Sequence, residues 1–310
     1  MTYISNLTYV LGDNKNILSL KENHNSDLLE LMSLRGLDCF SESTLSLKDL
    51  TTQVIDQFRT KVLNPKNIGY VIYVVDKLNS IDSSLPDQSE MLNQFLDQLG
   101  AYQAVPFFQT MLSCASLPMA LKAANNLIKA GDTDEVAVIY TNKVMDGESR
   151  FPYPAISVLS DVALAFSITK ENIYDGYEIQ LCEQSNQSSL KDYKSDEEYA
   201  SFLESQIAEC SNLFTKSLKK IQSQKEDVKR VYFNNYMPHL VKMFADELSL
   251  DESQLSLNNI TRFCHAYSAD TFINFCDDAA NLNTDETVIL LPNSITSWGV
   301  IALKPQKKNG

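Results

Sequence analysis

The sequence predicts an α/β protein made of two duplicated halves, and two observations lead to this prediction. Short apolar runs of the kind found in buried strands alternate along the chain with longer segments of helical periodicity. Residues 132–142 (DTDEVAVIYTN) also align without gaps with residues 283–293 (NTDETVILLPN), 151 positions further on. With 310 residues, of which 44% are hydrophobic, the chain is long enough for one large domain or two medium ones.

The individual elements follow from periodicity and composition. Apolar runs predict strands at 68–75, 135–141, 162–168, 230–236 and 287–292. Helical patterns predict helices at 46–62, 88–99, 116–130, 196–222, 237–248 and 268–280. Because strands and helices alternate, we expect sheets covered by helices. The polar stretch 182–201 indicates a surface loop leading into a helix, near the expected boundary between halves at 1–170 and 171–310.

The composition excludes several classes of partner and cofactor. The net charge of −14 and the pI of about 4.7 disfavour binding to nucleic acid or to an anionic membrane. No apolar run approaches the ~20 residues that span a bilayer, and the first residues lack the features of a signal peptide. Six cysteines without zinc spacing indicate free thiols in the reducing cytoplasm. The absence of a Cys/His cluster at zinc spacing predicts no metal, and the absence of a glycine-rich phosphate-binding motif predicts no tightly bound nucleotide cofactor.

The repeat predicts that a cysteine and a histidine lie close together. At the offset of 151 residues, Cys114 aligns with His265, and each residue precedes a predicted helix that leads into a repeated strand. In a duplicated α/β unit, two equivalent helix entrances are expected near the axis that relates the halves. A thiol becomes a nucleophile as a thiolate, and a neighbouring imidazole can accept its proton. We therefore expect Cys114 and His265 to form a catalytic pair.

The sequence around Cys114 fits a nucleophile at the entrance to a helix. Ser116 is a candidate cap for the helix, Pro118 suits its first turn, and Gly131 suits its end. The helix N-terminus offers free N–H groups and partial positive charge. The alternative is that Cys114 is a buried, core-filling thiol, because free cysteine is among the most buried residue types.

The segment SCASLPMALKAANNLIKAGDTDEVAVIYTN (113–142) resembles the nucleophile segment of the thiolase superfamily, in its ketoacyl synthase III branch. Looser matches lie at 32–40 (MSLRGLDCF), 159–169 (LSDVALAFSIT) and 293–304 (NSITSWGVIALK), in the family's order. The resemblance implies a thiolase-like five-layered α-β-α-β-α fold, with two duplicated halves related by a pseudo-twofold axis.

The sequence departs from this family where the family carries its histidine and asparagine. Asn234 stands at the position of the family's histidine, and His265 stands at the position of its asparagine; His239 lies five residues beyond Asn234, at a helix start. Decarboxylating condensation needs two donors that stabilise an enolate, whereas acyl transfer needs a thiolate and a base. With Asp270 to orient His265, the pattern resembles the acyltransferase subgroup of natural-product pathways.

The resemblance also implies the remaining parts of the site. Asn234 is expected to line it, and the backbone N–H of Ser294 is expected to form an oxyanion hole with that of Cys114. The family arginine that helps hold coenzyme A is replaced by Cys39 or Phe40. Acyl-coenzyme A and an acyl carrier protein are therefore both candidate donors, and the lysine-rich segment 216–230 is a candidate docking face.

We therefore expect an acyltransferase that loads an acyl group onto Cys114 and passes it to an acceptor in a secondary-metabolite or fatty-acid-related pathway. Two alternatives remain open: a decarboxylating ketosynthase that forms carbon–carbon bonds, and a non-catalytic partner subunit of a ketosynthase heterodimer. The family also implies a homodimer, or a heterodimer with a related subunit.

Overall fold

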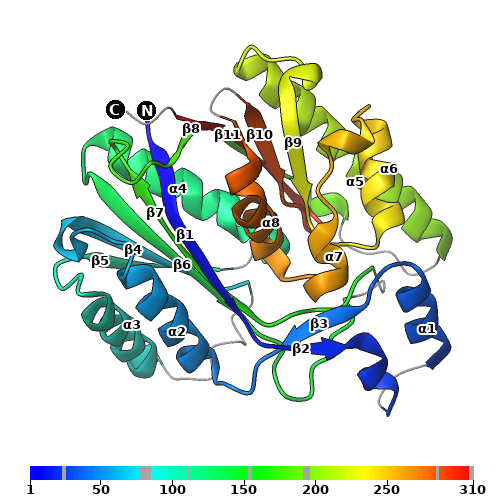
Figure 1. The fold of residues 1–310 in the computed structure, drawn as a ribbon, viewed down its shortest axis with the longest axis horizontal. Coiled ribbons are helices and arrows are strands. Elements are labelled where there is room, and N and C mark those ends of the chain that lie inside the picture. Colours follow the sequence, from blue (N-terminus) through cyan, green and yellow to red (C-terminus); the bar gives the residue numbers. More distant parts are fainter. Residues whose placement is uncertain are drawn as a thin grey trace.

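The computed structural model describes residues 1–22, 26–76, 85–110, 112–152, 156–190, 196–283 and 286–306 (Figure 1). Eight α-helices lie within these ranges: α1 (Ser26–Leu34), α2 (Leu47–Arg59), α3 (Leu85–Leu99), α4 (Ser116–Ala130), α5 (Asp196–Lys220), α6 (Pro238–Glu247), α7 (Asn258–Phe263) and α8 (Asp270–Asp278). The six predicted helices are all present in these ranges. None of the described helices is both long and apolar enough to cross a lipid bilayer.

Nine of the described strands form one mixed sheet in the order β5-β4-β6-β7-β1-β8-β11-β10-β9. Their bounds are β1 (Tyr3–Leu11), β4 (Ile68–Val74), β5 (Val105–Gln109), β6 (Glu135–Asn142), β7 (Val162–Thr169), β8 (Tyr177–Asn186), β9 (Val228–Phe233), β10 (Thr287–Leu291) and β11 (Ser297–Pro305). A separate hairpin pairs β2 (Asp13–Asn16) with β3 (Cys39–Glu42). The five strands predicted from apolar runs are β4, β6, β7, β9 and β10.

The strand order is mirrored about the centre of the sheet. On one side, β4 is parallel to β6 and β6 is antiparallel to β7; on the other side, β9 is parallel to β10 and β10 is antiparallel to β11. The two sides meet where β1 pairs with β8. Because β6 and β10 carry the repeated sequence, the duplication predicted from it is confirmed. Two residues of the second repeat, Thr284 and Asp285, lie outside the described residues.

The core consists of three hydrophobic clusters, which are packed between five layers of helices and strands (Figure 1). One outer cluster lies between α2 and α3 and the β4–β6 side of the sheet. The other outer cluster lies between α5 and α6 and the β9–β11 side. The central cluster joins both sides to α4 and α8, where the rings of Phe166 and Phe272 stack at 5.3 Å. The predicted five-layered α-β-α-β-α fold is therefore confirmed.

Two local predictions were wrong. Residues 182–186 belong to β8 rather than to a surface loop, and residues 191–195 of that predicted loop lie outside the described residues. β8 is only half-buried and carries polar side chains, so its composition resembles that of a loop until β11 pairs along its length. Ser116 does not cap α4; it is the first helical residue, and its hydroxyl donates to the Ser113 carbonyl at 2.7 Å. Gly131 does end α4, in the left-handed conformation with φ 85°.

Candidate active site

The entrances to α4 and α8 meet at the centre of the molecule. A 3₁₀ turn precedes each helix, Ser113–Ala115 before α4 and Tyr267–Ala269 before α8, and the two turns contact each other. The backbone N–H of Leu117 donates to Ser268 Oγ at 2.9 Å, across a separation of 151 residues. This is the offset of the sequence repeat, so equivalent residues of the two halves touch at the pseudo-twofold axis.

Cys114 and His265 are a second pair with the same offset. The sulfur of Cys114 lies 3.2 Å from Nε2 of His265, which is a hydrogen-bonding distance for sulfur. His265 is 2% exposed, whereas Cys114 is only partly buried. Cys114 is therefore partly accessible, whereas the imidazole beside its sulfur is buried.

Asp270 holds the far side of the imidazole. Its Oδ2 atom is hydrogen bonded to Nδ1 of His265 and also accepts the backbone N–H of Asn235 at 2.7 Å. Its Oδ1 atom accepts the backbone N–H of Ala266 at 2.6 Å. The carboxylate is completely buried, and both of its oxygens serve as acceptors. Cys114, His265 and Asp270 thus form a continuous relay in which the carboxylate fixes the orientation of the ring.

The charges of this relay change the protonation of His265. Burial by itself lowers the pKa of a histidine, but the carboxylate of Asp270 and the sulfur of Cys114 outweigh burial and raise the pKa of His265 to about 10. The imidazole therefore holds a proton at neutral pH. A protonated imidazole beside a sulfur is the arrangement in which a cysteine acts as a nucleophile.

The residues before the two reactive groups have unusual backbone angles. Ser113, before Cys114, has φ 49°, and Cys264, before His265, has φ 52° with ψ −134°. Non-glycine residues with such angles cost of order 1–3 kcal/mol and cluster at functional sites. Both of these strained residues, or elbows, come immediately before a member of the Cys114–His265 pair.

Solved structures with the same architecture cover nearly the whole chain. Synthase III for 3-oxoacyl-[acyl-carrier-protein] from Aquifex aeolicus matches with a TM-score of 0.81 at 16% identity, over 98% of this chain and 100% of that one. ChlB3, described as an acyltransferase, gives 0.83 at 15% identity over 99% and 98%. Xanthomonas campestris OleA with bound lauric acid and lauroyl-CoA gives 0.79 at 11% identity, over 98% of each chain. The chain has the ketoacyl synthase III fold. No protein-family model and no curated protein matches the sequence.

In this ketoacyl synthase III fold, two backbone groups hold the side-chain amide of Asn234. Its Nδ2 atom donates to the carbonyl of Tyr267 at 3.0 Å, and its Oδ1 atom accepts the backbone N–H of Asn293 at 2.8 Å. One N–H of this amide has no bond of this kind, so the role of substrate-lining donor expected for Asn234 stays a prediction. The rings of Tyr236 and Tyr267 pack 5.2 and 5.7 Å from that of His265.

The hydrogen bonds of Ser294 do not support the oxyanion-hole role expected for its backbone N–H. Its backbone N–H donates to the Ser297 carbonyl at 2.8 Å, which closes the turn before β11. An N–H engaged in this way is not free to stabilise an oxyanion. Within β11, Gly299 allows close approach to the first turn of α4, because a Cβ there would lie 2.4 Å from Cγ of Pro118.

Asp76 is a buried acid near the site, and it is not among the site residues predicted from the sequence. It follows β4, and its Oδ2 atom accepts hydrogen bonds from Tyr140 Oη at 2.7 Å and Asn142 Nδ2 at 3.3 Å. Its Oδ1 atom has no partner among the described residues. Burial raises the pKa of Asp76 to about 7, although the bond from Tyr140 and the positive charge of His265 oppose the shift. Asp76 could have been identified in the sequence as an acidic residue directly after an apolar strand.

Asp76→Asn is expected to stabilise the protein above pH 7. The ordinary pKa of 3.8 is raised in the folded state, so the stability associated with the protonated acid is complete below about pH 4 and is lost as the pH rises to about 7. The amide has no such penalty, and its advantage at pH 8 is at most about 4 kcal/mol, from 1.36 kcal/mol per pKa unit. Urea unfolding of both proteins at pH 4.5 and pH 8 measures it. Equal stabilities at pH 8 would contradict the prediction.

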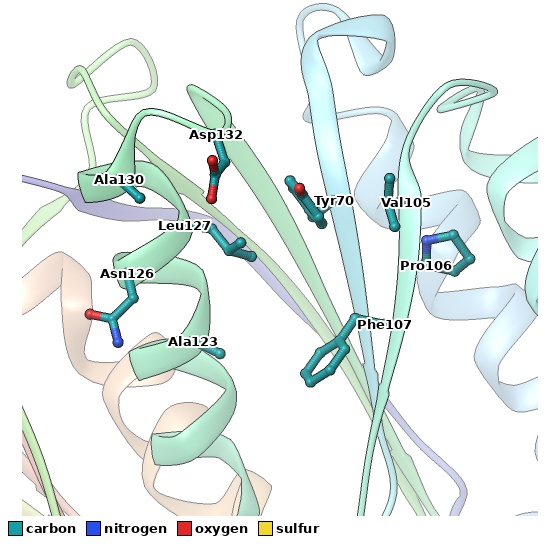
Figure 2. Close-up of a pocket in the computed structure, with 9 residues that line it drawn as sticks. All are labelled: Tyr70, Val105, Pro106, Phe107, Ala123, Asn126, Leu127, Ala130 and Asp132. Carbon is teal, nitrogen blue, oxygen red and sulfur yellow. The ribbon is translucent and has the colours of Figure 1, made fainter.

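A separate apolar groove lies along the edge of the sheet. Figure 2 shows Tyr70 and Phe107, on neighbouring strands, facing Ala123 and Leu127 of α4. The groove encloses about 410 Å³. Val105 and Phe107 of the edge strand β5 are about half exposed, at 52% and 46%.

The oligomeric state is a separate question. The homodimer, or heterodimer with a related subunit, that the family resemblance implies stays a prediction.

Proposed function

We propose that the protein is an acyltransferase of the synthase III type. Cys114 accepts an acyl group from a thioester of coenzyme A or of an acyl carrier protein, and His265 activates the acceptor that receives it. The observation that carries this proposal is the relay of Cys114, His265 and Asp270, in which the sulfur lies 3.2 Å from the imidazole. The names of the similar structures support the chemistry: one is described as an acyltransferase, and another binds lauroyl-CoA.

Each half-reaction balances its protons at His265. In acylation, the thiolate of Cys114 attacks the thioester carbonyl, a new carbon–sulfur bond forms, and the departing thiolate takes the proton from Nε2. In transfer, an acceptor hydroxyl or amine gives its proton to Nε2 and attacks the acyl-cysteine. Cys114 then leaves as a thiolate beside the protonated imidazole, so the starting state returns. Asp270 keeps the proton on Nδ1 throughout, because it accepts at that nitrogen.

The engaged amide of Asn234 favours transfer over decarboxylating condensation. Condensation would need Asn234 and His265 to donate together to the carbonyl of an extender unit, so that an enolate is stabilised. Asn234 is 1% exposed, and its carbonyl oxygen and one of its two amide N–H groups bond to backbone groups, so at most one N–H is left for an extender. The relay also argues against a non-catalytic partner subunit. Such a subunit acts through its surface and does not need a buried imidazole held between a thiol and a carboxylate.

Mass spectrometry of the intact protein tests the proposal. The wild type is incubated briefly with a panel of acyl-coenzyme A and acyl-carrier thioesters, beside Cys114→Ala. We expect one acyl group on the wild type and none on Cys114→Ala, and the donor that labels fastest identifies the carrier and the chain preferred. Hydroxyl or amine acceptors should then remove the label, whereas malonyl thioesters should not. If no donor labels the protein unless a related subunit is added, the partner alternative is correct.

A further inference from the structure

Arg150 and Asp161 form a buried ion pair close to the relay. Asp161 is completely buried, and Arg150 is 8% exposed. The guanidinium binds the carboxylate as a fork, with Nη1 3.1 Å from Oδ1 and Nη2 3.1 Å from Oδ2. Arg150 also lies over the ring of Phe40 at 5.1 Å. This two-point geometry is specific to arginine, because the ammonium group of lysine acts as a single point.

The pair fixes the segment that leads into β7. Asp161 accepts the backbone N–H groups of Ser43 at 2.8 Å and Val144 at 3.0 Å, so its carboxylate is anchored to two other segments. Arg150 holds Leu159 from both sides: its Nη1 donates to the Leu159 carbonyl at 2.9 Å, and its own carbonyl accepts the Leu159 N–H at 2.7 Å. Residues 159–161 are therefore fixed by the ion pair at both ends.

The same segment holds the backbone of His265. The N–H of His265 donates to the Val158 carbonyl at 2.9 Å, and the His265 carbonyl accepts the N–H of Ser160 at 2.8 Å. The hydroxyl of Ser160 donates to the carbonyl of Phe263. Leu159 forms a parallel β-bridge with His265. Both backbone polar groups of the catalytic histidine are thus bonded to the residues on either side of Leu159.

This contact is needed because the backbone before His265 is strained. Cys264 has φ 52° and ψ −134°, a conformation that a cysteine keeps only when its surroundings impose it. Its own N–H donates to Ile260 within the turn that ends α7, and the next residue is held by the 158–160 segment. If residues 158–160 were released, the backbone at Cys264 would relax and move the buried imidazole of His265 away from Cys114.

We propose that Arg150 is a positioning residue: its forked pair with Asp161 holds residues 158–160 against the backbone of His265 and so keeps the imidazole on Cys114. A buried ion pair is by itself weak evidence for stability, since apolar replacements are often neutral or better. A positioning role explains why a guanidinium with two bonds to Asp161 lies beside the segment that holds His265. The inference rests on the proposed function, since it concerns the same thiol and imidazole.

Alkylation of Cys114 by iodoacetamide tests the positioning without any acyl donor. Peptide mass spectrometry follows Cys114 in the wild type, Arg150→Lys and His265→Ala, at pH 6 and pH 9.5. At pH 6, rapid alkylation requires the imidazole to stabilise a thiolate. Arg150→Lys should react about 10- to 100-fold more slowly than the wild type at this pH, the range produced by a misplacement of about 1 Å. At pH 9.5 the two rates should agree within about twofold.

Arg230→Lys is the matched control, because Arg230 also pairs with a carboxylate, Asp278, at 3.3 Å, in a different part of the sheet. It should keep the wild-type ratio of rates. A folded Arg150→Lys with an unchanged ratio would overturn the inference. Should that variant not fold, Asp161→Asn, which keeps the size of the side chain, is measured instead, with the same expected loss at pH 6 and the same overturning result. Failure of every acyl donor to label Cys114 would count against the proposed function alone, because alkylation needs no donor.

Discussion

His265→Ala is expected to lower the rate of acyl transfer from Cys114 to its acceptor by about 10³- to 10⁴-fold. The imidazole lies 3.2 Å from the sulfur and is the nearest described base in the relay. Without it, no group takes the proton of the acceptor or returns a proton to the departing thiol. Single-turnover measurements, starting from acylated protein or from a free donor, separate the transfer step from the acylation step, and both should slow.

His239→Ala is the matched control for this prediction. His239 lies at the start of α6, where burial and the charge of Arg35, and not a group of the relay, lower its pKa. It should leave both steps within about twofold of the wild type. The pH dependence gives a second check: because the pKa of His265 is raised to about 10, the imidazole can donate a proton below that pH, and acylation should fall as the pH rises through about 10. A His265→Ala protein that transfers at more than a tenth of the wild-type rate would remove histidine from the mechanism.

Asp270→Asn is expected to reduce transfer by about 10³-fold, nearly as much as loss of the histidine itself. Both oxygens of Asp270 accept N–H groups: Oδ1 from Ala266, and Oδ2 from Asn235 and His265. An asparagine has one NH₂ group, which must then face one of these donors. The imidazole then either loses its acceptor at Nδ1 and changes tautomer, or rotates. In both cases Nε2 no longer exchanges a proton with the groups at the sulfur.

The same substitution should also destabilise the fold, by about 1–3 kcal/mol, because it leaves a buried N–H without an acceptor. Thermal unfolding and single-turnover kinetics measure the two effects separately. Asp277→Asn, on the same helix but paired with Arg262 near the surface, should leave transfer unchanged. If Asp270→Asn lost stability but kept its transfer rate, the carboxylate would be a structural group that does not orient the base.

Much of the fold could be predicted from the sequence because its central strands are buried on both faces. β4, β6, β7 and β10 are almost continuously apolar, and such runs are recognisable without any partner. β1 and β8 were not predicted as strands from their composition, because only some of their residues are buried. Their identity depends on pairing with each other and with β7 and β11, which are distant in sequence.

The site was predictable only where the repeat reached it. A fixed offset of 151 residues was enough to bring Cys114 to His265, since equivalent positions in a duplicated fold meet at the axis. The spacing also placed Asp270 five residues after His265, near the first turn of the next helix. No such rule applied to Asn234 and Ser294, whose hydrogen bonds to neighbouring backbone groups only the tertiary structure reveals.

The sequence by itself thus determined the layered α/β architecture, its duplication and the pairing of a thiol with an imidazole. These depend on hydrophobic periodicity and on an internal repeat, which are properties of the chain read in order. Only the tertiary structure decided which polar groups already have hydrogen-bond partners and that Asp76 lies buried beside the site. It also decided that Arg150 bonds to Leu159, in the segment that contacts His265. Hydrogen-bond saturation and burial arise from contacts between segments that only the fold brings together, such as Asp76 with Tyr140, 64 residues apart, and Ser160 with His265, and no local pattern records them.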